Sequence, residues 1–202
     1  MAKFPEYTEI PLFPIVDMRI RFNTLRTQFN TESVESRKRK FIYPRRDITV
    51  KYNHITKVHA ETLWEFVIAR AGSYESFNFF MPEPELSYPS YIGEYVGAGN
   101  GDTEVFNLPC KNSLAQTVYI DGVEQTESAD YNIDAGTGED GADRLEFNDS
   151  GMVAPNDGAI ITIDFTGILK IRSVFADDMV TFSMFRDMLV SCGIELRGLL
   201  NQ

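Results

Sequence analysis

The two histidines are the first side chains to consider as chemical groups, because nucleophilic catalysis usually needs an imidazole beside the nucleophile. His54 and His59 are the only histidines in the chain. No nucleophile-elbow serine motif, zinc-protease histidine pair or phosphate-binding loop accompanies them. We interpret residues 97–102 as a flexible loop, and its glycine-rich part, 97–101, lacks the lysine and the following helix that a phosphate loop requires. We therefore interpret both histidines as loop residues at the start of a helix.

Carboxylates are the second chemical candidates, because the chain has 30 acidic residues. Asp134, Glu139, Asp140 and Asp143 could gather around a calcium ion, which prefers several oxygen ligands. Their spacing does not match an EF-hand loop, and a solvated acidic hairpin end is the commoner structure. A carboxylate pair for glycoside hydrolysis stays open as an alternative, although no pair stands out. We predict no catalytic, cofactor-binding or metal-binding residues, and hence a protein that is not an enzyme.

Cysteine usage and charge limit the compartment and the partners. Cys110 and Cys192 are too few for a disulfide framework or a zinc site, which favours two reduced thiols in a cytosolic protein. No signal-peptide layout and no run of eighteen apolar residues is present, so we expect no membrane span. The net charge of −11 repels phosphate backbones and anionic lipids. We therefore expect neither sequence-specific nucleic-acid binding nor membrane binding.

The charge is unevenly distributed, and this gives the best signal for a domain boundary. Residues 92–168 contain 15 acidic and two basic residues, a net charge of −13. The remainder contains 15 acidic and 17 basic residues, a net charge of +2. We predict an inserted acidic domain at 92–168 within a discontinuous module formed by 1–91 and 169–202.

The hydrophobic pattern predicts a mainly β protein with one helix. Apolar residues at helical spacing from Leu63 to Ala71, followed by Gly72 as a left-handed cap, indicate the helix. We expect this helix to cover one face of a sheet. Ile48, Val50 and Tyr52 alternate with polar residues, as in a half-buried strand.

The acidic segment has its own pattern of short strands separated by turns. Asp121-Gly122 is a hairpin-turn dipeptide between two such strands. About six closely spaced strands predict a small antiparallel β-sandwich for 92–168. After Gly167 we expect three further strands, which would share a sheet system with the residues before 92 because neither part has enough strands alone.

The N-terminal region suggests surfaces for assembly. Residues 1–23 contain three prolines and are predicted to be an irregular or extended arm that could reach a neighbouring subunit. The basic residues that follow could dock against an acidic neighbour, although a solvated strand end is their ordinary interpretation. These candidate assembly residues are Arg37, Lys38, Arg39, Lys40, Arg45 and Arg46.

From about residue 11 to residue 200 the sequence resembles the distal tail protein family of long-tailed (siphovirus-type) phages and gene transfer agents. The resemblance begins with PLFP in the arm and FIYPRR before the strand that ends at Tyr52. It continues through the helix and its phenylalanine-rich continuation, ETLWEFVIARAGSYESFNFFMP. The acidic segment contributes GAGNGDTEVFNLP, VYIDGVEQ and APNDGAIITIDFTG, and the C-terminal region contributes LKIRSVFADDMVTFSMFRDMLVSCGIELRGL.

The resemblance implies a structural virion protein of the tail tip or baseplate. Such a protein forms a homohexameric ring that joins the tail tube to the hub or fibre complex, with a lumen through which DNA passes. The discontinuous module would form a β-sandwich-type ring, and the acidic insert would project outward. The protein would be assembled in the host cytoplasm and would reside in the virion. The resemblance carries over no catalytic or metal residues.

A second hypothesis belongs to a different class of protein. Small β-sandwiches often bind carbohydrates or receptors, so residues 92–168 could be the binding head of a host-recognition module. This hypothesis rests on fold analogy alone.

Overall fold

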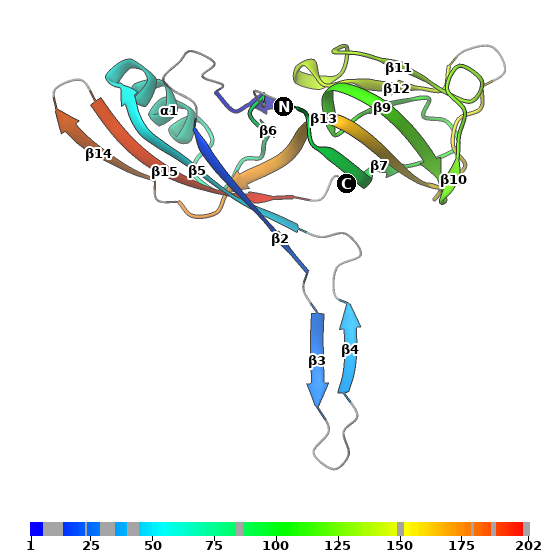
Figure 1. The fold of residues 1–202 in the computed structure, drawn as a ribbon, viewed down its shortest axis with the longest axis horizontal. Helices are drawn as coiled ribbons and strands as arrows, with labels where there is room; N and C mark the ends of the chain where they lie inside the picture. The colour runs from blue at the N-terminus through cyan, green and yellow to red at the C-terminus, as the bar shows by residue number, and fades with distance from the viewer. Residues whose placement is uncertain are drawn as a thin grey trace. The chain divides into compact units, whose positions relative to one another are not determined.

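The computed structural model describes residues 1–5, 14–22, 24–28, 35–39, 45–83, 87–148, 152–178, 180–186 and 189–199. The protein is mainly β with one α-helix, as the sequence predicts (Figure 1). No helix among these residues has the length and apolar character needed to cross a membrane.

The chain divides into two compact units. The helix unit comprises Pro5–Glu75 and Ser173–Leu200, and the sandwich unit comprises Met1–Phe4 and Ser76–Arg172. Both ends of the acidic segment therefore lie inside the sandwich unit, which begins 16 residues before the predicted boundary at 92 and ends four after 168. The additional residues include Phe77–Phe80, strand β6, which is buried throughout.

The helix unit is built on an antiparallel sheet. β5 (Arg45–Thr56) lies between β2 (Ile15–Arg21) and β15 (Leu189–Gly198). The other side of β15 pairs with β14 (Thr181–Arg186) and then with the end of β13, at Ser173–Phe175. Alternate side chains of β5 and β15 are buried, so one face of the sheet carries the core of this unit.

Helix α1 (Lys57–Ala69) covers that face (Figure 1). Its N-cap is Thr56, whose side chain accepts a hydrogen bond from the His59 backbone. Leu63 is buried against the sheet, and the ring of Phe66 lies 6.2 Å from that of Phe175. The predicted apolar face is partly wrong, because Trp64 and Ile68 are exposed. The buried residues of the helix are Ala60 and Leu63. The side of the helix that packs against the sheet is therefore narrower than the apolar face predicted from the sequence.

The turn after α1 is held by a carboxylate from the other segment of this unit. Gly72 has φ +64°, the left-handed conformation predicted for it, and lies two residues beyond the C-cap Arg70. Asp178 accepts hydrogen bonds from the Ser73 backbone nitrogen at 2.9 Å and from its hydroxyl at 2.5 Å. These bonds lower the pKa of Asp178. A Cβ at residue 72 would lie 2.8 Å from the Asp178 carboxylate, so this turn requires glycine.

The N-terminal arm is more regular than predicted. Ala2–Lys3 (β1) pairs in parallel with β6 of the same chain, and β2 pairs with β5 over seven residues. Pro5 and Pro14 lie outside both strands, so they do not interrupt either ladder. The part of the arm from 6 to 13 lies outside the described residues. β3 (Thr24–Gln28) and β4 (Glu35–Arg39) pair with each other as a separate two-stranded ladder.

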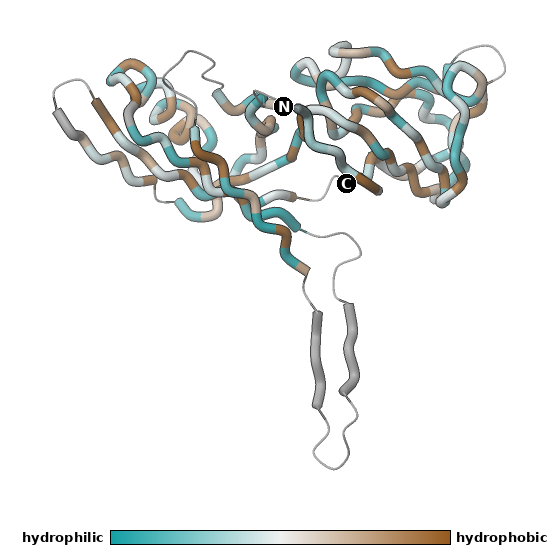
Figure 2. Tube along the Cα trace, in the orientation of Figure 1, coloured by the Kyte–Doolittle hydropathy of each residue, from teal (hydrophilic) through white to brown (hydrophobic). Residues whose placement is uncertain are grey.

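The sandwich unit consists of two sheets. One contains β7 (Ser90–Ala98), β13 (Ile160–Phe175), β9 (Cys110–Ile120) and β10 (Val123–Glu124), and β6 pairs with the later part of β13. The other contains β11 (Asn132–Asp134), β12 (Arg144–Glu146) and β8 (Val105–Asn107). The sheets are in contact, because the Gly97 position of β7 faces the ring of Phe106 in β8. Buried and more exposed residues alternate along the first part of β13, and Figure 2 shows hydrophobic and hydrophilic residues following one another along the coloured strands.

Two glycine-containing segments of the sandwich unit test the sequence interpretation, and one prediction is wrong while the other is confirmed. Gly97 and Ala98 belong to β7 rather than to a flexible loop. Gly99, just beyond them, is buried, and a Cβ there would lie 2.4 Å from the carbonyl oxygen of Asn156. The glycines here therefore allow close packing of two backbone segments. Asp121-Gly122 forms the predicted hairpin turn, with φ values of 52° and 80°.

β13 also differs from the prediction. Residues 160–175 form one continuous strand, so the residues from 169 to 175 are not a separate strand. Gly167 suggested a break, but it lies within the strand, and a Cβ there would lie 3.0 Å from the Cα of Ser113 in β9. A close approach between strands, and not a turn, explains this glycine.

Candidate assembly interface

The predicted basic assembly residues lie on two ladders of the helix unit. Arg37, Lys38 and Arg39 are in β4, where Arg37 pairs with Arg26 of β3. Lys40 lies outside the described residues, and for β3 and β4 the structure describes the backbone pairing alone. Like charges directly opposite each other on a strand ladder repel. The Arg26–Arg37 pair therefore concentrates positive charge, and an acidic partner bound there would stabilise the ladder.

Arg45 and Arg46 begin β5, on the second ladder. Arg45 is opposite Arg21 of β2, and Arg46 is opposite Ile20. Arg21 donates a hydrogen bond to Asp47 over 3.4 Å, which offsets part of this positive charge. Arg21 and Arg26 are further members of the basic region that no local pattern predicts, because only strand register shows that they lie opposite the predicted residues.

Both lateral edges of the helix-unit sheet are open within the described part of the chain. β2 pairs with β5 on one side only, and β14 pairs only with β15. An open edge presents backbone N–H and C=O groups to any strand that can pair with them. Ile15, Ile20 and Phe22, in or beside β2, are each more than half exposed, as is Met184 of β14. Exposed apolar side chains on an unpaired strand are typical of a surface that another chain covers.

Of the two histidines, only His59 has a described side chain, and it lies at the N-terminus of α1. The Nδ1 atom of His59 lies 3.1 Å from the Thr56 hydroxyl at the helix N-terminus, which fits the predicted structural role. His54 lies in β5, and its side chain is outside the described part of the chain.

The four candidate calcium ligands are directed to different partners. Arg144 donates a hydrogen bond to Asp134 at 3.4 Å, and Glu139 pairs with the α-amino group of Met1. Asp140 accepts a hydrogen bond from Asn78 at 2.8 Å. Among the described residues no three acidic, histidine or cysteine side chains are grouped as a metal site would require.

Asp143, the fourth of these residues, is a structural anchor of the sandwich unit. Its side chain is 1% exposed. One carboxylate oxygen accepts hydrogen bonds from the backbone nitrogen of Ser113 at 2.8 Å and from the Ser113 hydroxyl. The other accepts a hydrogen bond from the backbone nitrogen of Gly136 at 2.9 Å. A buried carboxylate with this many donors holds β9 and the 134–143 loop together.

Both cysteines are buried and free. Burial raises the pKa of the Cys110 thiol to about 12 and that of the Cys192 thiol to about 11. Because the thiolate is the reactive form, both side chains are expected to be inert at neutral pH.

Comparison with known proteins adds no family assignment. Neither a protein-family model nor a curated protein sequence matches the chain.

Proposed function

We propose that this protein is a structural virion component, the adaptor ring of the distal tail, that joins the tail tube to the hub or fibre complex at the tail tip or baseplate. The resemblance of residues 11–200 to distal tail proteins supports this proposal. Its partners are further copies of itself, the tail tube protein and hub or fibre proteins. It is assembled in the host cytoplasm, resides in the virion, and has no catalytic centre, metal or cofactor, no sequence-specific nucleic-acid site and no membrane partner.

The observation that carries the proposal is the pair of open edges on the helix-unit sheet. A closed ring needs two different surfaces on each subunit that are complementary to each other. β2 and β14 lie at opposite edges of one antiparallel sheet, and both present exposed apolar side chains. Contact between β2 of one copy and β14 of the next would cover both edges and propagate around the ring. The number of subunits in the proposed ring, six, comes from the resemblance to distal tail proteins.

The mass of the protein in solution tests this proposal. Light scattering at several concentrations and salt levels, followed by negative-stain imaging, should show a ring with a central hole. Six copies of the 22.9 kDa chain correspond to about 137 kDa. A strict monomer at every concentration, also when mixed with the tail tube protein, would contradict the adaptor-ring proposal.

A second candidate function, a carbohydrate- or receptor-binding module, is favoured by one face of the sandwich unit. Thr162 of β13 lies between Tyr95 of β7 and Tyr119 of β9, so two tyrosines and a hydroxyl form a row across three strands. The Tyr119 hydroxyl lies 3.5 Å from Asp164 in the neighbouring row. Aromatic rings beside polar groups suit a sugar, which has both apolar faces and hydroxyl groups.

A glycan array probed with the full chain decides between the two functions. Binding that is lost in Tyr119→Ala would support a recognition module. Absence of binding to all glycans would favour a purely structural sandwich unit.

A further inference from the structure

The outer face of the larger sheet in the sandwich unit is accessible to a ligand. Ile161, Ile163 and Phe165 of β13 are buried in the core of the unit. Because successive side chains of a strand point to opposite faces, Thr162 and Asp164 lie on the outer face. Both are partly exposed. The row of tyrosines described above therefore belongs to a surface and not to the core.

The tyrosine row continues to a carboxylate at one edge of the sheet. Glu124 of β10 is directly opposite Tyr119 of β9, which in turn is opposite Thr162 and then Tyr95. Directly opposite residues share a face of the sheet, so all four side chains lie on the outer face. Glu124 is exposed, and no described residue donates a hydrogen bond to its carboxylate.

Asp164 provides a second carboxylate beside the same tyrosine. The Tyr119 hydroxyl lies 3.5 Å from one Asp164 oxygen, and the other oxygen accepts a hydrogen bond from the Gly93 backbone nitrogen at 2.7 Å. Burial raises the pKa of the Tyr119 hydroxyl, and Asp164 and Glu124 act in the same direction. Two negative charges thus lie close enough to this hydroxyl to affect its titration.

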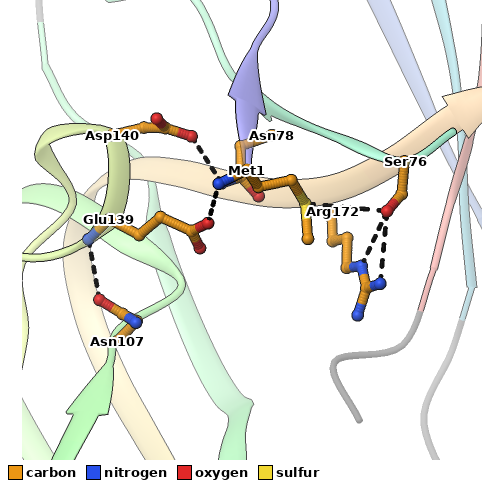
Figure 3. A network of polar contacts seen from close by, with 7 residues as sticks. All are labelled: Met1, Ser76, Asn78, Asn107, Glu139, Asp140 and Arg172. Carbon is orange, nitrogen blue, oxygen red and sulfur yellow. Dashed lines mark hydrogen bonds and ion pairs between the residues drawn. The ribbon is translucent and has the colours of Figure 1, made fainter. Parts of the chain in front are cut away.

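Several other carboxylates of the sandwich unit are bound within the chain. Figure 3 shows two of them, Glu139 with the α-amino group of Met1 and Asp140 with the Asn78 side chain. A cationic ligand would have to displace these contacts before it could bind there. It can approach Glu124 without displacing a hydrogen bond.

Basic side chains are kept away from the tyrosine row. Residues 92–168 contain only two, Lys111 and Arg144. Lys111 is opposite Ile168, at the other end of β9 from Tyr119. Arg144 belongs to the other sheet, where it pairs with Asp134 and Glu146. The outer face therefore attracts positively charged ligands and repels negatively charged ones.

We propose that this face binds a glycan whose sugars carry protonated amino groups, such as glucosamine residues that are not acetylated. The proposal rests on the second candidate function, the recognition module, and names the class of sugar that the module takes. Tyr95 and Tyr119 stack against the apolar faces of two sugar rings, and Glu124 and Asp164 bind the ammonium groups. The two tyrosines are two strand spacings apart, about 10 Å, so neighbouring sugars of one chain can reach both.

Biolayer interferometry with the full chain on immobilised oligosaccharides tests the proposal below the pKa of the sugar amine. The probes are a glucosamine hexasaccharide, its fully N-acetylated form and a galacturonic acid hexasaccharide. The amine form should bind roughly tenfold more tightly than the N-acetylated form at low salt, and less so at high salt, because exposed ion pairs are weak and screened. The uronic acid should not bind.

Each other result decides a different question. Equal affinity for the amine and N-acetylated forms would overturn the amino-sugar proposal and leave the recognition function standing. Binding of the uronic acid as tight as that of the amine form would overturn it as well. Absence of binding to these probes and to every glycan of an array would remove the recognition function, and this proposal with it.

One double variant separates the two carboxylates from the overall acidity of the chain. Glu124→Gln/Asp164→Asn removes both charges but keeps the size and an acceptor for the Gly93 nitrogen. It should bind the amine and N-acetylated forms equally. The matched control, Asp102→Asn/Glu104→Gln, makes the same change at exposed positions outside the strands of this sheet and should keep the tenfold preference. If the preference survives in Glu124→Gln/Asp164→Asn with the fold intact by circular dichroism, the amine is bound elsewhere and the proposal is wrong.

Discussion

Replacing Ile15 and Ile20 by lysine is expected to abolish self-association while leaving the fold of the helix unit intact. Both side chains are more than half exposed on the open edge strand β2, so the fold loses little buried apolar surface. In the proposed ring both are covered by the neighbouring copy. Losing two such contacts costs about 3 kcal/mol, which raises the dissociation constant roughly 100-fold. Lysines on an edge strand also oppose pairing with another strand.

Light scattering across a concentration series measures this effect, and circular dichroism verifies the fold. The matched control is Val123→Lys, which places the same charge on an exposed apolar position of the sandwich unit. That control should associate as the unaltered chain does. If Ile15→Lys/Ile20→Lys associates equally well, β2 is not part of the interface.

The second large effect is expected from Asp143→Ala. Removing this carboxylate leaves two backbone donors, on Ser113 and Gly136, without their acceptor inside the sandwich unit. Each unsatisfied buried donor costs about 1–3 kcal/mol, so we expect a loss of roughly 2–5 kcal/mol in the free energy of unfolding. That is a large fraction of the total stability of an ordinary domain.

Urea denaturation followed by circular dichroism gives the free energy directly. Asp102→Ala removes an exposed aspartate from a loop of the same unit and should change the stability by less than about 0.5 kcal/mol. Asp143→Asn keeps the volume but turns one acceptor into a donor, and should fall between the two. If Asp143→Ala is as stable as Asp102→Ala, the carboxylate is not an anchor.

Local patterns were sufficient to predict the fold class and most of the elements. Alternating residues such as Ile48, Val50 and Tyr52 indicate a strand because side-chain direction reverses at each residue. The Asp121-Gly122 turn was predictable for a similar reason, since it needs only two residues that accept positive φ. The position of helix α1 was predicted correctly, but its buried face was not. Whether Trp64 is buried depends on which residues of the sheet face it, and these are distant in the sequence.

Glycine was the main source of error in the strand boundaries. Gly97 and Gly167 suggested a loop and a break, yet both lie inside strands. In each case the missing side chain makes room for another element, the ring of Phe106 or the backbone at Ser113. A single sequence does not distinguish a glycine needed for a turn from one needed for close packing.

The amino-acid sequence by itself determined that this protein is mainly β with one helix and that its acidic residues are concentrated in one segment. Only the tertiary structure decided which strands lie at open edges, that Arg21 lies opposite Arg45, and that Asn78 meets Asp140. The physical reason is that strand propensity and turn geometry depend on neighbours along the chain. Edges, registers and buried polar contacts depend on pairing between segments distant in sequence, which no local pattern encodes.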